Sequence, residues 1–207
     1  MWSLTLITAA VKEPLDISLD VRAHLRLEQI ADSQDRLLGS MVVAARHACE
    51  TFTGRQLLDA TWELWMDDWW EAGIFQGGAL FVPKPPLRSI VSVKYVDMAG
   101  VLQTWDVAKY SAEVQDVTAV APMCQRGRVY PNYGEIWPDI RCQPGAVKVR
   151  FTAGYGATGP TVPAGLKQGM LLEIGEMYER RELAVVGSSV TPATLSAEAL
   201  WWPYRAF

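Results

Sequence analysis

One amphipathic helix that ends at a glycine constrains the fold more than any other feature of the sequence. Between residues 32 and 53 apolar side chains recur every three or four positions, as one face of a helix requires. Asp32 can cap its start, and Asp35 falls in the first turn, where the helix dipole favours an acid. Gly54 stands where a helix C-terminus needs a residue with positive φ. The pattern therefore predicts a helix with one buried face.

The period changes after Gly54. Alternating apolar residues, three prolines at positions 83, 85 and 86, and glycines at turn positions replace the helical spacing. Proline disfavours helix in the residue before it. We therefore predict an all-β block over residues 57–153, with strands near 61–67, 80–83, 90–97, 101–105, 127–130 and 146–152.

Two further helices are expected on either side of this block. Residues 18–28 have an apolar side and Ser18 as a candidate N-cap, and residues 163–183 begin with Pro163, which suits the first helical position. The predicted fold class is α+β: a small helical core (about 18–28, 32–53 and 163–183), an inserted all-β block and an extended C-terminal tail. The expected domain organisation is 1–56 for the N-terminal helices, 57–153 for the β block, 154–184 for the last core helix, and 185–207 for the tail.

The charge balance argues against a protein that grips nucleic acid. The net charge is −4 and Lys and Arg are scattered, whereas phosphate binding needs a basic face. The apolar start, Met1–Ala10, lacks the basic residues of a signal peptide, and no apolar run reaches the roughly 20 residues of a membrane span. We expect a chain that is soluble and cytoplasmic when it is made, with no membrane partner.

The candidates for chemistry are weak. Cys49, Cys124 and Cys142 form no C-x-x-C pair. His47 and Cys49 are two positions apart on a helix and point in different directions. Residues 154–159 match G-x-G-x-x-G, but two prolines separate them from the next helix, whereas a dinucleotide site needs the helix to begin on the glycines. No catalytic, cofactor-binding or metal-binding residue is predicted.

Nine tryptophans are many for 207 residues, and two groups of aromatic residues invite a functional interpretation. One is a set around the first predicted strand of the β block, which is either half core and half sheet edge or a platform that stacks sugars or binds protein: Trp62, Trp65, Trp69 and Trp70. The other lies in the tail, which either packs onto its own domain or anchors a partner, since aromatic anchors dominate binding energy when a pocket receives them. The tail residues assigned to partner docking are Leu200, Trp201, Trp202, Tyr204 and Phe207.

Several motifs in a fixed order resemble one family, the head–tail connector (adaptor) proteins of tailed phages and gene transfer agents. The stretch from Ala44 to Leu58 contains Glu50-x-x-Thr53-Gly54-Arg55-x-Leu57, which is similar to a stretch in these connectors. Other pieces follow in the order of the family: Trp62, residues 83–97 with Gly100, Tyr110, Trp137-Pro138, residues 147–156, Val162-Pro163, and Tyr178 with Arg181-Glu182. The likeness covers residues 18–183.

The resemblance implies a structural ring subunit without enzymatic residues. Such a ring, typically of twelve copies, joins the portal of the head to a neck (stopper) or tail protein in the virion. DNA passes through its channel without specific binding. A terminal segment of the family docks on the portal, which we expect of the tail here. Two alternatives are a Trp-rich carbohydrate-binding β module and an enzyme with an unrecognised site.

Overall fold

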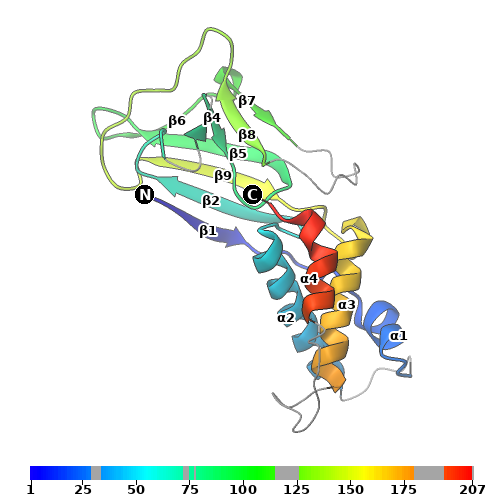
Figure 1. Cartoon of the computed structure of the whole chain (residues 1–207). Coiled ribbons are helices and arrows are strands. Elements are labelled where there is room, and N and C mark those ends of the chain that lie inside the picture. The colour runs from blue at the N-terminus through cyan, green and yellow to red at the C-terminus, as the bar shows by residue number, and fades with distance from the viewer. Residues whose placement is uncertain (29–33, 72–74, 77, 115–125, 180–193, 207) are drawn as a thin grey trace. The chain divides into compact units, whose positions relative to one another are not determined.

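The computed structural model describes residues 1–28, 34–71, 75–76, 78–114, 126–179 and 194–206 (Figure 1). These residues divide into two compact units. The β unit comprises the described parts of 1–10, 59–114 and 126–155, and the helical unit comprises those of 11–58 and 156–206. The α+β class predicted from the sequence is confirmed.

The β unit contains a five-stranded sheet in which all neighbours are antiparallel. Its order is β1 (Trp2–Thr8), β2 (Ala60–Met66), β9 (Val147–Ala153), β5 (Leu87–Val96) and β6 (Leu102–Thr104). In β9, Val147, Val149 and Phe151 are buried, while Lys148 and Arg150 point to the other face. This alternation with a period of two is what the sequence predicted for a strand with one buried face.

A smaller sheet completes the β unit. Its order is β3 (Phe75–Gln76), β4 (Ala79–Phe81), β8 (Arg128–Pro131) and β7 (Tyr110–Glu113). One buried cluster contains Leu64 and Val149 from the larger sheet together with Leu80 and Val129 from the smaller sheet. The two sheets therefore share a core, and each such side chain contributes roughly 1.5–3 kcal/mol by leaving water.

Strand β1 lies outside the β block expected at residues 57–153. It pairs with β2 in a register that places Leu4 opposite Leu64, so residues 1–10 join the β unit and not the helices of residues 1–56. The alternation of Trp2, Leu4 and Leu6 with Ser3 and Thr5 is the local signal for a strand. The partner strand lies some 60 residues away, and no nearby turn announces the pairing.

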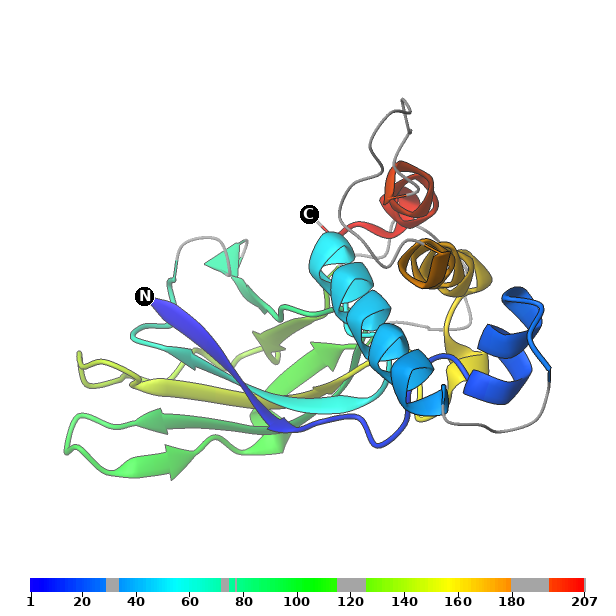
Figure 2. The same cartoon turned by 90° about the horizontal axis from the view of Figure 1, so that it is seen from below.

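Three helices of the helical unit pack together: α2 (Asp35–Thr53), α3 (Ala164–Glu179) and α4 (Thr194–Trp201). Figures 1 and 2 show them side by side. Leu38, Val42 and Ala45 are buried on α2, and Gly54 ends the helix at φ 70°, with its amide bonded to the Glu50 carbonyl at 3.0 Å. The predicted periodic face and the predicted glycine cap are both present.

The first helical segment is shorter than the predicted 18–28. It consists of a π-helical turn, η1 (Ile17–Val21), followed by α1 (Arg22–His24). The N-cap is Asp16 and not Ser18, because the Asp16 carboxylate accepts bonds from the amides of Ser18 (2.8 Å) and Leu19 (2.9 Å). The helix stops because Arg26 adopts a positive φ of 56°, which a continuing helix does not allow.

The C-terminal tail was expected to be extended, but it forms helix α4 and a 3-10 turn, η4 (Trp202–Tyr204). Its apolar side chains explain the difference, because they pack against α3 and α2 and thereby stabilise a short helix. The expected cap Asp32, the last residues of the predicted third helix (180–183), the Gly-Ser stretch near 187 and Phe207 lie outside the described residues.

Candidate partner-binding surface

The weak candidates for catalysis do not converge. His47 is exposed on α2, whereas Cys49 is buried, and that burial raises the pKa of the Cys49 thiol so that it stays protonated. Gly156 is followed by a 3-10 turn, η3 (Gly159–Thr161), and α3 begins only at Ala164, so no helix N-terminus stands on the glycine-rich loop. Among the described residues, no group of three His, Cys, Asp or Glu side chains is placed to hold a metal ion.

The four tryptophans around β2 differ in how deeply they are buried in the β unit. Trp69 is buried, its ring centroid lies 4.5 Å from that of Trp137, and its indole N–H donates to the Pro138 carbonyl at 2.9 Å. The Lys148 Nζ lies over the ring of Trp65, 4.0 Å from the ring centroid. Of the four tryptophans that sequence reasoning grouped there, only Trp70 is classed as exposed, at 61%. One ring of this group is therefore buried, two are partly buried and one is exposed, so the four do not form a row of exposed rings for stacking sugars.

The aromatic tail is split between the core and the surface. Trp201 is only 2% exposed, and its indole N–H donates to the Leu166 carbonyl of α3 at 3.2 Å. Its ring also lies near Phe52 of α2, with centroids 6.0 Å apart. Leu200 and Tyr204 are partly buried. These side chains hold the tail against its own helical unit. Packing of the tail onto its own domain was one of the two interpretations that the sequence allowed.

The connector-like motif at the end of α2 holds this tail in place. The Arg55 guanidinium is fully buried and donates to the Tyr204 carbonyl, while the Ala206 amide donates to the Thr53 carbonyl at 2.7 Å. Glu50 accepts bonds from the Gln56 side chain at 2.9 Å and from the Leu57 amide at 3.0 Å. The motif therefore fixes the helix end and the returning C-terminus, which is a structural role.

One tail residue that sequence reasoning selected does present an exposed ring. Trp202 is 57% exposed. Its ring centroid lies 6.3 Å from that of Phe52, and the Arg205 guanidinium lies 5.4 Å from its ring. We call these three residues the Trp202 patch. An aromatic ring beside an arginine at a surface is the composition typical of a protein-binding hot spot.

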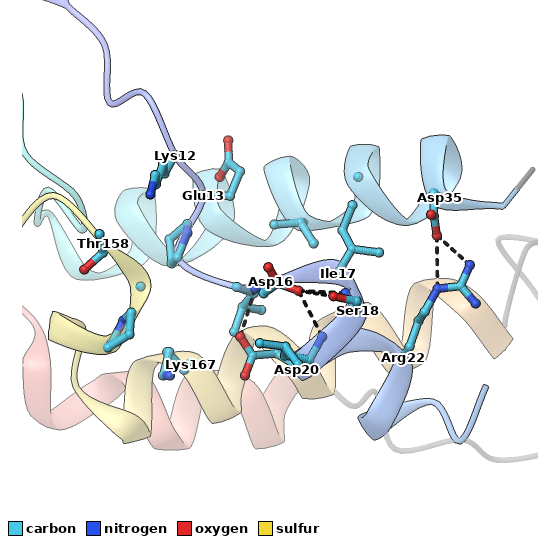
Figure 3. A pocket seen from close by; sticks show the side chains of 17 residues that line it. Lys12, Glu13, Asp16, Ile17, Ser18, Asp20, Arg22, Asp35, Thr158 and Lys167 are labelled. Atoms are coloured by element: carbon cyan, nitrogen blue, oxygen red, sulfur yellow. Dashed lines mark hydrogen bonds and ion pairs between the residues drawn. The ribbon is translucent and has the colours of Figure 1, made fainter. Parts of the chain in front are cut away.

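The helical unit also contains a groove that the sequence did not reveal. Figure 3 shows it between the segment from Lys12 to Asp20, the start of α2, and the loop before α3. Its volume is about 920 Å³. Its lining residues come from three segments that are distant in the sequence and share no motif. The Asp-x-Ser capping pattern at residues 16–18 is the one local signal for this groove in the sequence.

The carboxylates of this groove are already engaged within the chain. Asp16 caps η1, and its hydrogen bonds from Ser18 and Leu19 lower its pKa. Asp35 accepts bonds from Arg22 at 3.1 and 2.5 Å (Figure 3). Asp20 accepts a bond from the Asp16 amide at 2.9 Å. Asp16 and Asp20 thus stabilise the turn itself, and Asp35 links the start of α2 to Arg22 of α1.

No helix among the described residues is long and apolar enough to cross a membrane. No protein-family model matches the chain, and no curated protein matches it.

Solved structures that are similar along nearly the full length come from gene transfer agent particles. A chain in the neck of an empty particle, computed with C6 symmetry, has a TM-score of 0.75 and 27% identity over 99% of this chain and 96% of that one. A chain in the virion of a native particle has a TM-score of 0.73 and 27% identity, with 99% and 95% covered. A chain in a native neck computed with C12 symmetry has a TM-score of 0.68 and 25% identity, over 99% of this chain and 96% of that one. These similarities support a structural role in a particle neck.

Proposed function

We propose that this chain is the adaptor subunit of a head–tail connector: a ring protein that joins the portal of a phage or gene transfer agent head to the neck or tail. The observation that carries the proposal is the similarity, over 99% of the chain, to chains from gene transfer agent necks. Those necks were computed with sixfold and twelvefold symmetry, which supports a symmetric ring of the present chain, with twelve copies as the proposed number.

DNA passes through such a ring during packaging and delivery. The net charge of −4 suits a channel wall that DNA slides past, because a basic surface would hold the phosphates. We assign no base-reading role and no catalytic role to the chain. The location that follows is the virion neck, after assembly in the host cytoplasm.

Within the tail, the proposed portal-docking element is the Trp202 patch. Leu200, Trp201 and Tyr204 position it, since they pack against the helical unit and leave the indole of Trp202 exposed. Phe207 remains assigned to docking from the sequence alone. Desolvating an exposed indole in a partner pocket commonly contributes about 2 kcal/mol or more to binding, which is roughly thirtyfold in affinity.

Electron microscopy of the neck tests the proposal. Particles assembled with this chain should show a ring of it on the portal, and particles without it should lack the neck. A neck that forms normally without this chain, or a ring found elsewhere in the particle, would contradict the adaptor role.

The docking surface has a sharper test, binding of purified chain to purified portal. The variant Trp202→Ala should weaken binding by roughly thirtyfold and leave the unfolding temperature unchanged. Trp70→Ala is the matched control, because Trp70 is similarly exposed but belongs to the β unit. If both variants bind the portal as the unmodified chain does, the portal site lies elsewhere, while the ring role stands.

A further inference from the structure

Strand β1 is an edge strand whose side chains are mostly exposed. It pairs with β2 on one side, and no described strand pairs with its other side. Leu4 is partly buried, but the other six residues of the strand are exposed, including Trp2 at 42% and Leu6 at 46%. A row of backbone N–H and C=O groups flanked by apolar side chains is a template for pairing with another strand.

The strand lacks the usual protection against such pairing. Its sequence, Trp-Ser-Leu-Thr-Leu-Ile-Thr, contains no charge and no proline, and it is seven residues long. Natural edge strands are commonly short, or carry lysine or proline, or are covered. The two edges of the other sheet, β3 and β7, are two and four residues long, and β7 ends in Glu113. Among the described strand edges, β1 is the long uncharged one.

The opposite edge of the same sheet is also uncharged. Strand β6, Leu-Gln-Thr, pairs with β5 and with no other described strand, and all three of its residues are exposed. Val101, which precedes it, is exposed as well. The five-stranded sheet therefore ends in two different uncharged edges, and a head-to-tail contact between identical subunits joins two different patches.

The strand registers place the two edges in line. Ser3 of β1 lies opposite Trp65, Trp65 opposite Lys148, Lys148 opposite Lys94, and Lys94 opposite Thr104 of β6. Ser3 and Thr104 thus stand in one row, on one face, at the two ends of the sheet. Four strand spacings of about 4.8 Å separate them, roughly 19 Å, so they cannot touch within one copy.

We propose that β1 of one copy pairs with β6 of the next copy, so that the sheet continues from subunit to subunit around the ring. The proposal rests on the ring function above and says which surfaces close the ring. A second copy is the occupant because a ring contact joins two different patches of one chain, and the long uncharged edge β1 and the short uncharged edge β6 end the same sheet.

The geometry of the strands is compatible with this pairing. Every neighbouring pair in the sheet is antiparallel, so β1 and β6 point the same way and would meet as a parallel pair.

Disulfide trapping tests this contact. We would assemble particles with the double variant Ser3→Cys and Thr104→Cys, in a background in which Cys124 and Cys142 are replaced by serine. Neighbouring strands bring Cα atoms to within the reach of a disulfide. Oxidation should therefore yield a ladder of covalent multimers that collapses on reduction, and each single variant should yield no ladder. Thr5→Cys with Thr104→Cys covers a register that is shifted by two residues.

A matched control measures random collision. Tyr133 is fully exposed in the β unit but lies on a loop, so Ser3→Cys with Tyr133→Cys should give no ladder. If microscopy shows the ring in the particles and neither edge pair yields more multimers than this control, the edge pairing is wrong and the adaptor function stands. If the particles contain no ring of this chain, the proposed function fails, and the pairing fails with it.

Discussion

The close packing of Trp201 on Gly169 should contribute measurably to the free energy of unfolding of the helical unit. Gly169 lies on α3 beneath the indole of Trp201, and a Cβ added there would lie 2.2 Å from the indole nitrogen and 2.8 Å from Cδ1. The ring cannot easily retreat, because it is buried and bonded to the Leu166 carbonyl. Gly169→Ala therefore forces Trp201 out of its place.

The change in the free energy of unfolding combines two costs and one gain. Overpacking costs typically about 1–3 kcal/mol, and losing the indole hydrogen bond costs about 0.5–1.5 kcal/mol. Alanine in a helix interior gains about 1 kcal/mol over glycine. We expect Gly169→Ala to lower the free energy of unfolding by roughly 1–3 kcal/mol, a few degrees in the melting temperature at about 2–4 °C per kcal/mol for a chain of this size.

Gly175→Ala on the same helix is the control. The nearest atom to a Cβ there is His24 Nε2 at 3.5 Å, an ordinary contact, so this variant should gain up to about 1 kcal/mol. The assay is urea unfolding followed by far-ultraviolet circular dichroism, in the wild-type and Trp201→Ala backgrounds. Gly169→Ala should be tolerated once Trp201 is gone. If it behaves like Gly175→Ala in the wild-type background, or costs the same in both backgrounds, the packing argument is refuted.

Three further outcomes are expected. Removing residues 200–207 should destabilise the helical unit, because the deletion removes the buried Trp201, and a truncated chain with unchanged thermal unfolding would count against the packing of Trp201 described above. Asp16→Ala should lower stability by about 0.5–2 kcal/mol as a lost N-cap, and Ser18→Ala by less, in the same unfolding assay. Burial, with Glu176 and Glu198 nearby, raises the pKa of Glu173. The folded state therefore holds that proton to higher pH than the unfolded chain, and stability falls as pH rises above about 4.5. Glu173→Gln should stabilise the chain at pH 7 but not at pH 4, and an equal effect at both pH values would refute the assignment.

The sequence predicted the parts of the fold that local patterns determine. The periodic face of α2 and the glycine at its end are both present, as is the alternation of β9, because each is set by residues within a few positions of one another. Strand β1 was missed, since its pairing with β2 depends on residues some 60 positions away. The length of the first helix was also misjudged, because the positive φ of Arg26 has no glycine or proline to announce it.

The tail shows why a candidate surface is harder to predict than a core. Trp201 and Trp202 are adjacent and chemically identical, yet one is 2% and the other 57% exposed. The difference depends on Gly169, which leaves room for a single indole against α3. The glycine lies more than 30 residues away, so composition and spacing in the tail cannot distinguish the anchor of the fold from the exposed ring.

The distribution of the nine tryptophans bears on why the chain carries so many. Trp69, Trp105 and Trp201 are buried and stabilise the two units, whereas Trp2, Trp70 and Trp202 are exposed. Exposed indoles are unfavourable in water, so a monomer gains nothing from them, while a subunit that buries them against neighbours does. A ring subunit needs contacts to both sides and to the components above and below. Trp2 lies on the edge strand that we assign to the next copy, and Trp202 on the patch that we assign to the portal. Trp70 packs against Phe75 and belongs to neither of these two surfaces, so Trp70→Ala should leave the ring and its portal contact intact.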